Sequence, residues 1–505
     1  MTLPSTMEVT VVLTPRGGSG ALHGTVETLR GTRVGERQHL SYATLESAHG
    51  ADPRHIEALR AHAASHGLTV SDVNAVGPSV KLRGDADAMG SAFGVHLVER
   101  RNTINGAAAT YLDHDEEPSL PDALSGAAVA ILGLRTRPLA RPKFVVAGPA
   151  AAGQGNTALD VARAYGLPAG AAASGSVIGI VELGGGYTDS DVTAYAAALR
   201  IAVPQVTAVS VDGVSNSPSG SVSSPDGEVA LDIDVIAAVA AGAAIRVYFA
   251  PNTEQGFVDA IATAARDGCV AVSISWGAPE AGWSSSGMQA LDQACQGALA
   301  LGTPVFAASG DRGSADGISD GRSHADFPAS SPHAVGCGGT ALPALTVAQE
   351  TSWNDLASGG GAGGGAVSDV WPLPAFQQQA NPPPSVNDGK VRRTVPDLAA
   401  DAAPATGYRV LVGGSWYILG GTSAVAPLIC AMHALVDSAV AAAHPGQRIG
   451  DFTSVLYGTL APGGGVHDIA DGSGNGQYVT RPGYDAVTGW GSPEFGRWMS
   501  LLTGD

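Results

Sequence analysis

Runs of uninterrupted apolar residues alternate with alanine-rich stretches of helical length between residues 177 and 308. The runs show no polar alternation, so each predicts a strand that is buried on both faces. Strands separated by helices favour a parallel sheet covered by helices on both sides, which is a doubly wound α/β fold. The expected strands are Val177–Leu183, Arg246–Phe249, Val270–Ser275 and Val305–Ala308, and the expected helices are Val192–Ala198, Glu228–Ala243, Phe257–Arg266 and Gly287–Ala300.

The composition of the 505-residue chain limits the classes of protein to which it can belong. With 44% hydrophobic residues the chain can bury a large core, and its length indicates two or more domains or one large domain with an appendage. A net charge of −19 argues against a nucleic-acid partner. We find no apolar run of membrane-spanning length and no secretory signal at the N-terminus, so we expect no membrane partner, and we expect a monomer.

The four cysteines each lie in an apolar run, and no pair has CxxC spacing. This pattern argues against zinc and predicts buried free thiols, with no disulfide that folding requires. The residues are Cys269, Cys295, Cys337 and Cys430.

Residues 1–135 are predicted to form a small α+β domain without a catalytic constellation. The expected elements are strand Met7–Thr14, a helix from Asp52-Pro53 to Ala63, strands Leu68–Val73 and Val80–Leu82, helix Asp85–Phe93 and strand His96–Arg100. The order β-α-β-β-α-β predicts a ferredoxin-like fold. His23-Gly24-Thr25 resembles part of a subtilisin histidine motif, but no second histidine follows, so we give it no catalytic role.

Residues 136–156 differ in composition from the segments on either side. Arg137 to Pro142 contains two prolines, and Ala147 to Gly155 consists mostly of small residues. This composition predicts a linker, beyond which residues 157–505 form the second domain.

Gly420-Gly421-Thr422-Ser423 lies between a short β-like run, Trp416–Leu419, and an apolar helix-like run, Leu428–Met432. The two glycines allow a sharp turn that places the Ser423 hydroxyl at the N-terminus of a helix, where the N–H groups and the helix dipole favour negative charge. A nucleophilic serine is presented in this way. A turn that only caps the helix is the alternative.

Glu228 and Asp232 lie four residues apart on a helix that is apolar nearly all round. The spacing places both carboxylates on one face, and their burial predicts a shared proton and a raised pKa for one of them. A solvated surface pair is the alternative. Asp234 points elsewhere and is expected to be a solvated or structural carboxylate.

Asp311 follows the last expected strand, in Ser309-Gly310-Asp311-Arg312-Gly313. Ligands bind at the carboxyl ends of the strands in open parallel sheets, so Asp311 is a candidate site residue. The alternative is an aspartate that caps its own turn.

Taken in their order along the chain, the motifs resemble those of the sedolisins, the serine-carboxyl peptidases, and the resemblance covers nearly the whole chain. The resemblance rests on Glu228–Asp232, Ser309–Gly313, Asp326–Pro332, Pro396-Asp397 and Gly420–Pro427, together with Glu182–Tyr187 and Trp276. It implies a subtilisin-like fold and an acid-active endopeptidase that is made as a self-processing zymogen. A tripeptidyl aminopeptidase of the same family and a non-catalytic surface-binding homologue are the alternatives.

The resemblance also implies roles for single residues. Ser423 would be the nucleophile and Glu228 the general base, while Asp232 would orient Glu228 and share its proton. Glu182 and Trp276 would extend this carboxylate network. A carboxylate base suits acid, in which a histidine base would be protonated.

Asp311 is implied to stabilise the oxyanion, for which it must be protonated so that it can donate a hydrogen bond. Asp316 and Asp326 flank the turn after Asp311. They either line the pocket for the residue before the scissile bond or form structural hydrogen bonds.

The C-terminal segment resembles the calcium site of the family. Asp468 and Asp485 would supply carboxylates, and Ile469, Arg481 and Gly483 would supply backbone carbonyls, which are the hard oxygen ligands that Ca²⁺ prefers. Arg481 replaces an expected glycine. One structural Ca²⁺ is expected, and an ordinary loop of glycine and aspartate is the alternative.

Residues 1–135 are implied to be the propeptide, which would assist folding and inhibit the enzyme within the same chain until the linker is cut. The expected partners are protein and peptide substrates. The family and the acid chemistry imply an extracellular location.

Overall fold

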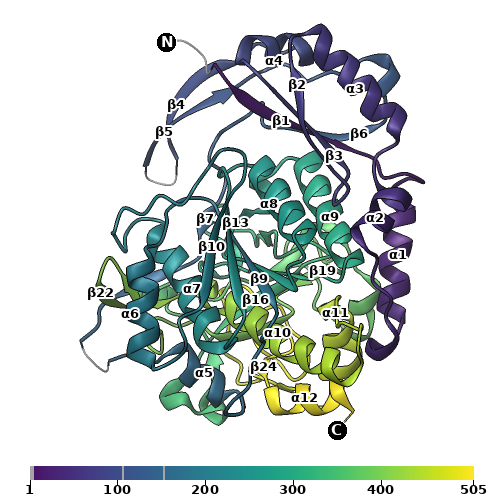
Figure 1. The fold of residues 1–505 in the computed structure, drawn as a ribbon. Helices are drawn as coiled ribbons and strands as arrows, with labels where there is room; N and C mark the ends of the chain where they lie inside the picture. Colours follow the sequence, from purple (N-terminus) through teal and green to yellow (C-terminus); the bar gives the residue numbers. More distant parts are fainter. Residues whose placement is uncertain (1–4, 105–106, 152–153, 505) are drawn as a thin grey trace.

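The computed structural model describes residues 5–104, 107–151 and 154–504. Ala152 and Gly153 of the expected linker lie outside the described residues. A small N-terminal domain, purple to blue in Figure 1, lies against one side of a larger domain, and two of its helices extend down the flank of that domain.

The larger domain is built on an eight-stranded sheet with the order β10-β11-β9-β12-β14-β16-β17, in which β20 also pairs with β16. All pairings are parallel except that of β17 with β16. The parallel sheet and its four expected strands are confirmed. The strands are β9 (Val177–Glu182), β10 (Gln205–Ser210), β11 (Ala244–Phe249), β12 (Ala271–Ile274), β14 (Val305–Ala308), β16 (Val335–Ala341), β17 (Thr351–Ser352) and β20 (Leu398–Asp401).

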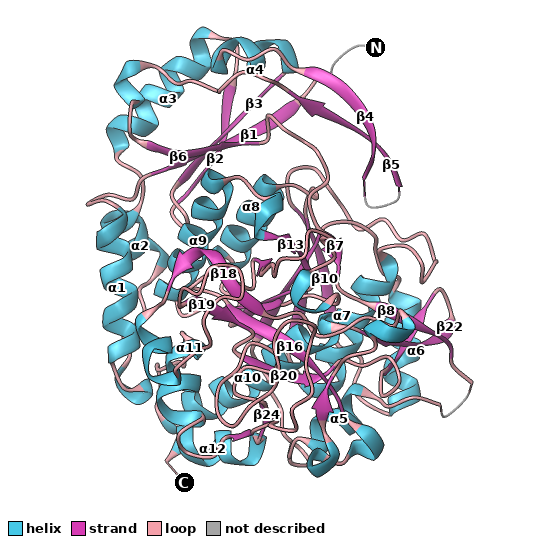
Figure 2. Ribbon diagram, turned by 180° about the vertical axis from the view of Figure 1, so that it is seen from behind, coloured by secondary structure: helices cyan, strands magenta, loops and turns pink. Residues whose placement is uncertain are grey.

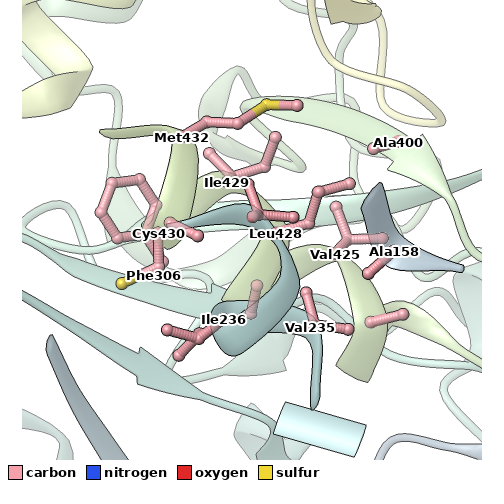
Figure 3. Packing of buried hydrophobic residues seen from close by; sticks show 14 of the residues in the cluster. Ala158, Val235, Ile236, Phe306, Ala400, Val425, Leu428, Ile429, Cys430 and Met432 are labelled. Atoms are coloured by element: carbon pink, nitrogen blue, oxygen red, sulfur yellow. The ribbon is translucent and has the colours of Figure 1, made fainter. Parts of the chain in front are cut away.

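Helices cover both faces of this sheet. On one face lie α5 (Ala158–Ala164), α7 (Asp226–Val239), α10 (Val425–Ala443) and α12 (Phe495–Thr503), with α6 (Asp189–Leu199) beside α7; on the other lie α8 (Glu254–Arg266) and α9 (Ser285–Ala300). Figure 3 shows side chains of α10 meeting those of α7 and of β14 in the core. Burial of such side chains stabilises the fold by about 1.5–3 kcal/mol each.

Helix α10 is at the centre of this core. The stretch Thr422–Ala443 is long and apolar enough to span a membrane, so the expectation that no apolar run has this length was wrong. However, 83% of its apolar window is buried inside the protein. Its apolar character is therefore explained by packing against the sheet on one side and neighbouring helices on the other.

The N-terminal domain has a four-stranded antiparallel sheet with the order β2-β3-β1-β6. Val9, Val11 and Leu13 of β1 pack toward α3 and α4, whereas Val12 belongs to the cluster that contains α8 and α9 of the larger domain. The elements are β1 (Met7–Leu13), α1 (Ser19–Gly31), α2 (Tyr42–His49), α3 (Pro53–Ser65), β2 (Thr69–Asn74), β3 (Ser79–Gly84), α4 (Ala86–Phe93) and β6 (Ala128–Leu132).

The last strand of this sheet is not the expected His96–Arg100. That segment overlaps β4 (Val98–Ile104), which pairs with β5 (Ala107–Asp113) in a separate hairpin. The position in the sheet is taken by β6, because β6 buries apolar side chains on the sheet whereas β4 is mostly exposed.

The expected linker contains two strands that lie on the larger domain. β7 (Arg141–Pro142) pairs antiparallel with β13 (Trp276–Pro279), and β8 (Val145–Pro149) pairs with β22 (Ser415–Gly420). The other partner of β22 is β21 (Tyr408–Val412), and the other partner of β13 is β15 (Asp326–Phe327). Short elements complete the domain. Figure 2 labels β18 (Ala366–Pro372), β19 (Arg392–Val395), α11 (Phe452–Val455) and β24 (Ser492–Pro493), and β23 (Val466–His467) pairs with β24.

Candidate active site

Ser423 lies in a short turn between β22 and α10. Gly421 has a φ of 112°, and a Cβ atom there would lie 2.3 Å from the carbonyl oxygen of Lys143 and 2.7 Å from Cα of Phe144. A side chain at this position would therefore fill the space that the segment between the domains occupies. The turn presents a buried Ser423 at the N-terminal end of α10.

Glu228 is the hydrogen-bond partner of the Ser423 hydroxyl. Ser423 Oγ donates to Glu228 Oε2 at 2.8 Å, and Glu228 lies in the first turn of α7. Asp232, one turn later, accepts from Ser275 Oγ at 2.8 and 3.0 Å. Both carboxylates are fully buried, and Ser275 directly follows β12.

Burial raises the pKa of Glu228 well above its ordinary value, and the nearby Asp232 and Glu182 raise it further. Burial likewise raises the pKa of Asp232 and of Glu182. Trp276 Nε1 donates to Glu182 Oε2 at 2.9 Å, so the indole holds the third carboxyl group at the end of β9. Three carboxyl groups in one dry region titrate as a group rather than independently.

Asp234, on the same helix, has a different environment. It is buried, and its Oδ2 accepts a hydrogen bond from the backbone N–H of Leu411 at 3.1 Å. Asp234 is therefore a structural carboxylate that links α7 to β21.

Asp311 follows β14, the strand next to β12, so the carboxyl ends of adjacent strands bring it close to the serine. Its Oδ1 accepts from the N–H and the hydroxyl of Thr422 at 2.7 and 2.9 Å. Its Oδ2 is buried, has no hydrogen-bond partner in the described part of the chain, and lies 2.7 Å from the position of a Cβ on Gly421. Burial raises the pKa of Asp311 to about 7.

Lys143, from the segment between the domains, lies between the candidate catalytic residues of the larger domain. Its N–H donates to the carbonyl of Ser275 at 3.0 Å and to Glu228 Oε2 at 3.0 Å. Its carbonyl oxygen accepts from the N–H of Ser423 at 2.9 Å. A cleft of about 950 Å³ flanks this segment, and its lining includes Asp311 and Asp316.

The side chain of Lys143 lies in an acidic pocket. Its Nζ forms a hydrogen-bonded ion pair with Asp326 and lies 3.7 Å from Asp316 Oδ1. Burial alone would lower the pKa of Lys143, but the two carboxylates more than offset this effect and raise it. Gly277 makes room for the pair, because a Cβ there would lie 2.0 Å from Asp326 Oδ1.

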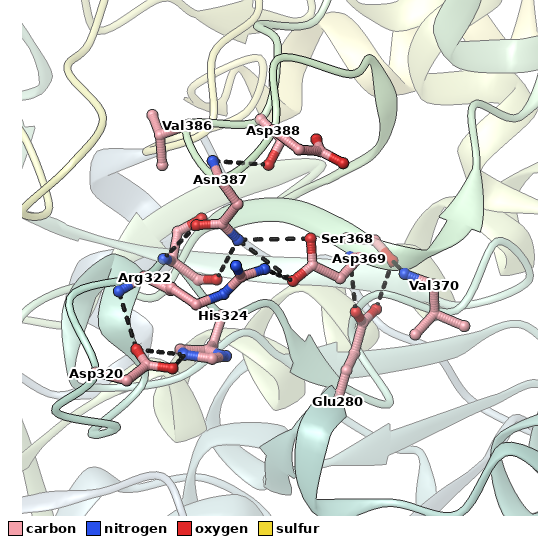
Figure 4. A network of polar contacts seen from close by, with 12 residues as sticks. Glu280, Asp320, Arg322, His324, Ser368, Asp369, Val370, Val386, Asn387 and Asp388 are labelled. Carbon is pink, nitrogen blue, oxygen red and sulfur yellow. Dashed lines mark hydrogen bonds and ion pairs between the residues drawn. The ribbon is translucent and has the colours of Figure 1, made fainter.

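Polar contacts brace the loop that leads to Asp326 (Figure 4). Arg322 pairs with Asp369 at 3.1 Å, and His324 Nε2 lies 3.0 Å from Asp320 Oδ1. Glu280 accepts from the N–H of Asp369 at 3.0 Å. The Arg322–Asp369 pair joins the loop to β18, whereas the His324–Asp320 pair lies within the loop and, among the described residues, has no hydrogen bond or ion pair with the Lys143 ammonium.

The predicted calcium ligands lie in one loop region. Gly483 N donates to Asp468 Oδ2 at 2.8 Å, and Arg481 N donates to Asp485 Oδ2 at 3.0 Å. Burial raises the pKa of Asp485 to about 6, and the nearby Asp468 adds to this rise. Among the described residues, no hydrogen bond is donated to the carbonyls of Ile469, Arg481 or Gly483.

Two carboxylates and three free carbonyls are a donor set that fits a hard cation. The Arg481 side chain does not compete for the region between them. Its Nε and Nη2 donate to the carbonyls of Tyr484 and Asn381 at 3.1 and 2.6 Å.

Two site residues were not identified from the sequence. Ser275 was seen only as the end of a strand, although the ends of parallel strands are where site residues gather. Lys143 is one of three lysines in the chain, and this rarity was its one available signal. The four cysteines are buried and free, as expected.

Comparisons with known proteins identify the families and relatives that the chain matches. The activation domain of pro-kumamolisin matches residues 4–137, and the subtilase family matches residues 145–490. Kumamolisin of Bacillus sp. (strain MN-32) is 41% identical over 508 residues, which cover 96% of this chain and 90% of that protein. Tripeptidyl-peptidase sed5 of Aspergillus fumigatus is 26% identical, with coverage of 98% and 92%.

A solved structure supports the same assignment. Pseudomonas sedolisin, complexed with two molecules of pseudo-iodotyrostatin, is 26% identical with a TM-score of 0.59, and the match covers 70% of this chain and 98% of that one. The chain therefore belongs to the sedolisin family of serine-carboxyl peptidases and carries a propeptide of the pro-kumamolisin type at its N-terminus.

Proposed function

We propose that this protein is an acid-active serine-carboxyl endopeptidase whose first substrate is its own Lys143–Phe144 bond. The observation that carries the proposal is the position of Lys143, which is held by the backbone of Ser275 on one side and of Ser423 on the other. The Lys143 carbonyl is thus next to a serine hydroxyl that is already hydrogen-bonded to Glu228.

In the proposed reaction, Ser423 Oγ forms a bond to the carbonyl carbon of Lys143 while its proton passes to Glu228. The oxyanion accepts hydrogen bonds from the Ser423 N–H and from protonated Asp311. Collapse of the intermediate breaks the C–N bond, and Glu228 returns the proton to the amine of Phe144. Water then hydrolyses the ester with the same base.

Asp311 gives the reaction its expected pH dependence. With a pKa of about 7, Asp311 holds its proton below this value and can donate a hydrogen bond, whereas above it the ionised carboxylate would repel the oxyanion. Glu182, Glu228 and Asp232 need to carry only one negative charge between them for Glu228 to act as base. Their raised pKa values favour this state in acid.

The path of the segment supports an endopeptidase over a tripeptidyl-peptidase. Residues 139–143 run continuously along the larger domain before the proposed cleavage point. The N–H of Ala140 donates to Asn252 Oδ1 at 2.8 Å, and Leu139 N donates to the Asn252 carbonyl at 3.1 Å. An enzyme that releases tripeptides requires a groove that closes three residues before the cut, and this chain continues beyond that point.

The pocket around the Lys143 ammonium supports a preference for lysine or arginine before the scissile bond. Asp316 and Asp326 are both buried there, so a neutral side chain would leave them without a cation. We also propose that Asp468, Asp485 and the carbonyls of Ile469, Arg481 and Gly483 hold one structural Ca²⁺.

Self-processing in acid tests the proposal. Precursor brought to about pH 4 should lose residues 1–143 and acquire Phe144 as its new N-terminus, as read by intact mass and N-terminal sequencing. Ser423→Ala and Glu228→Ala should stay at full length under the same conditions. Processing of isolated Ser423→Ala at the wild-type rate would show that this serine does not make the cut.

A further inference from the structure

We propose that His23 and Glu27 of the propeptide, together with His333 of the larger domain, bind a divalent transition-metal ion of the Zn²⁺ class that joins the two domains. One possible ligand atom from each of the three residues lies within 4.8 Å of the other two. The site goes beyond the proposed peptidase function and does not depend on it.

The propeptide supplies two of the three ligands from one helical face. His23 and Glu27 are four residues apart on α1, a spacing that stacks their side chains on the same side. Helix α1 packs beside α9 of the larger domain, and Arg30 of α1 donates to the carbonyl of Pro332 at 2.9 Å (Figure 1). This contact positions α1 directly against the residue before His333.

His333 has the features of a metal ligand that is held in place in advance. It is 5% exposed, and its Nδ1 lies 2.8 and 3.0 Å from the two oxygens of Asp292 on α9. Its Nε2 is buried and has no hydrogen-bond partner among the described residues. Histidines that bind metals donate their other ring N–H to a carboxylate in this way, which fixes the tautomer and leaves one nitrogen lone pair free.

The charges around the cluster suit a dication. The carboxyl groups of Glu27 and Asp292 lie on the side of the cluster where a dication would bind, and a histidine binds a metal through a ring nitrogen that carries no proton. Arg30 donates to Glu27 Oε1 at 2.7 Å, which leaves Oε2 for the metal, and Arg30 is itself paired with Asp451 at 3.1 Å.

Two imidazoles and a carboxylate, with water in the fourth position, are a known Zn²⁺ donor set. Zn–N distances of about 2.0–2.1 Å require the ligand atoms to approach more closely than 4.8 Å. The exposed His23 and half-buried Glu27 can make this movement, because their side chains are not packed in the core. The absence of CxxC spacing among the cysteines does not bear on this site, which uses no thiolate.

The test uses the full-length Ser423→Ala chain at pH 7, freed of metal and resupplied with calcium. Zn²⁺ is titrated by calorimetry, and Co²⁺ is titrated by its visible absorption, which reports coordination geometry. We expect one ion per chain and a higher unfolding midpoint with Zn²⁺. His23→Ala should abolish binding, and Asp292→Asn should weaken it about 10–100-fold. His96→Ala, an exposed histidine of the propeptide outside the cluster, should bind as the parent does.

His23 is exposed, so its removal should leave the fold unchanged, and the circular dichroism spectrum and metal-free unfolding midpoint check this. Failure of the parent to bind Zn²⁺ at micromolar concentration would overturn the proposal. Equal binding by His23→Ala and the parent would also overturn it, as would equal losses in His23→Ala and His96→Ala.

Discussion

The backbone N–H of Ser423 donates a hydrogen bond of 2.9 Å to the carbonyl oxygen of Lys143. Lys143 belongs to the segment that follows the propeptide, and Ser423 belongs to the turn that opens α10. This segment between the domains thus lies along the cleft in the manner of a substrate. The same contact that would block access for other substrates also aligns the bond that we propose is cut first.

Replacement of Lys143 should control self-processing. Lys143→Glu places a third carboxylate beside Asp316 and Asp326, and an uncompensated buried charge costs about 3 kcal/mol or more, which is about a hundredfold in rate. Conversion at about pH 4, followed by intact mass, should slow by at least that factor. Lys143→Arg keeps the cation and should convert readily. Lys390→Glu makes the same change of charge at a lysine outside the cleft and serves as the matched control. Conversion of Lys143→Glu at the wild-type rate would contradict the assigned cleavage point.

The acidic pocket should determine selectivity in the mature enzyme. Asp326→Asn removes the partner of the basic side chain, and a hydrogen bond to a charged group contributes about 1.5–3 kcal/mol. The ratio of kcat/KM for peptides with lysine against leucine before the cut should fall about tenfold or more. Asp320→Asn, in the same loop but paired with His324, should leave the ratio unchanged. An unchanged ratio in Asp326→Asn would assign that residue a structural role only.

Activity should fall as the pH rises through about 7, the value to which burial raises the pKa of Asp311 in the precursor. Below that pH the protonated carboxyl donates to the oxyanion, and above it the donor is lost. Asp311→Asn has an amide donor at every pH and can still accept from Thr422. Rates of processing from pH 4 to pH 8 should therefore decline less steeply for this variant. A wild-type optimum at pH 7–8 would refute the carboxylate mechanism.

Calcium should stabilise the protein without taking part in catalysis. Ligand binding to the folded state at 100 times Kd adds about 2.7 kcal/mol, so a chelator should lower the wild-type Tm by several degrees. In Asp468→Ala the chelator should have no further effect. Asp471→Asn changes a nearby aspartate that instead contacts Ser473 and Thr480, and should keep the wild-type response. A wild-type Tm that is insensitive to chelator would mean that no ion is bound.

Local patterns were sufficient for the elements that carry the candidate site. Continuous apolar runs predicted β9, β11, β12 and β14, and the spacing of Glu228 and Asp232 placed them on one face of α7, where the structure has them. β16 was missed because its glycines give a weak strand signal. Those glycines are needed for close packing, since a Cβ on Gly338 would lie 2.5 Å from Pro396.

Contacts between distant segments decided the path of the linker and the order of strands in the propeptide sheet. The sequence of residues 136–156 indicates a break between domains, but β7 and β8 form by pairing with β13 and β22, which lie far along the chain. The choice of β6 over β4 as the fourth strand of the propeptide sheet is equally non-local, because it depends on which strand can bury its side chains.

The sequence by itself determined four strands of the large sheet, the turn that presents Ser423 and the helical carboxylate pair, because each depends on the geometry of a few consecutive residues. Only the tertiary structure decided that Lys143 lies between Ser275 and Ser423, and that His23 lies close to His333. These pairs are formed by residues far apart in the chain. Their distances follow from how two domains pack, which no local spacing records.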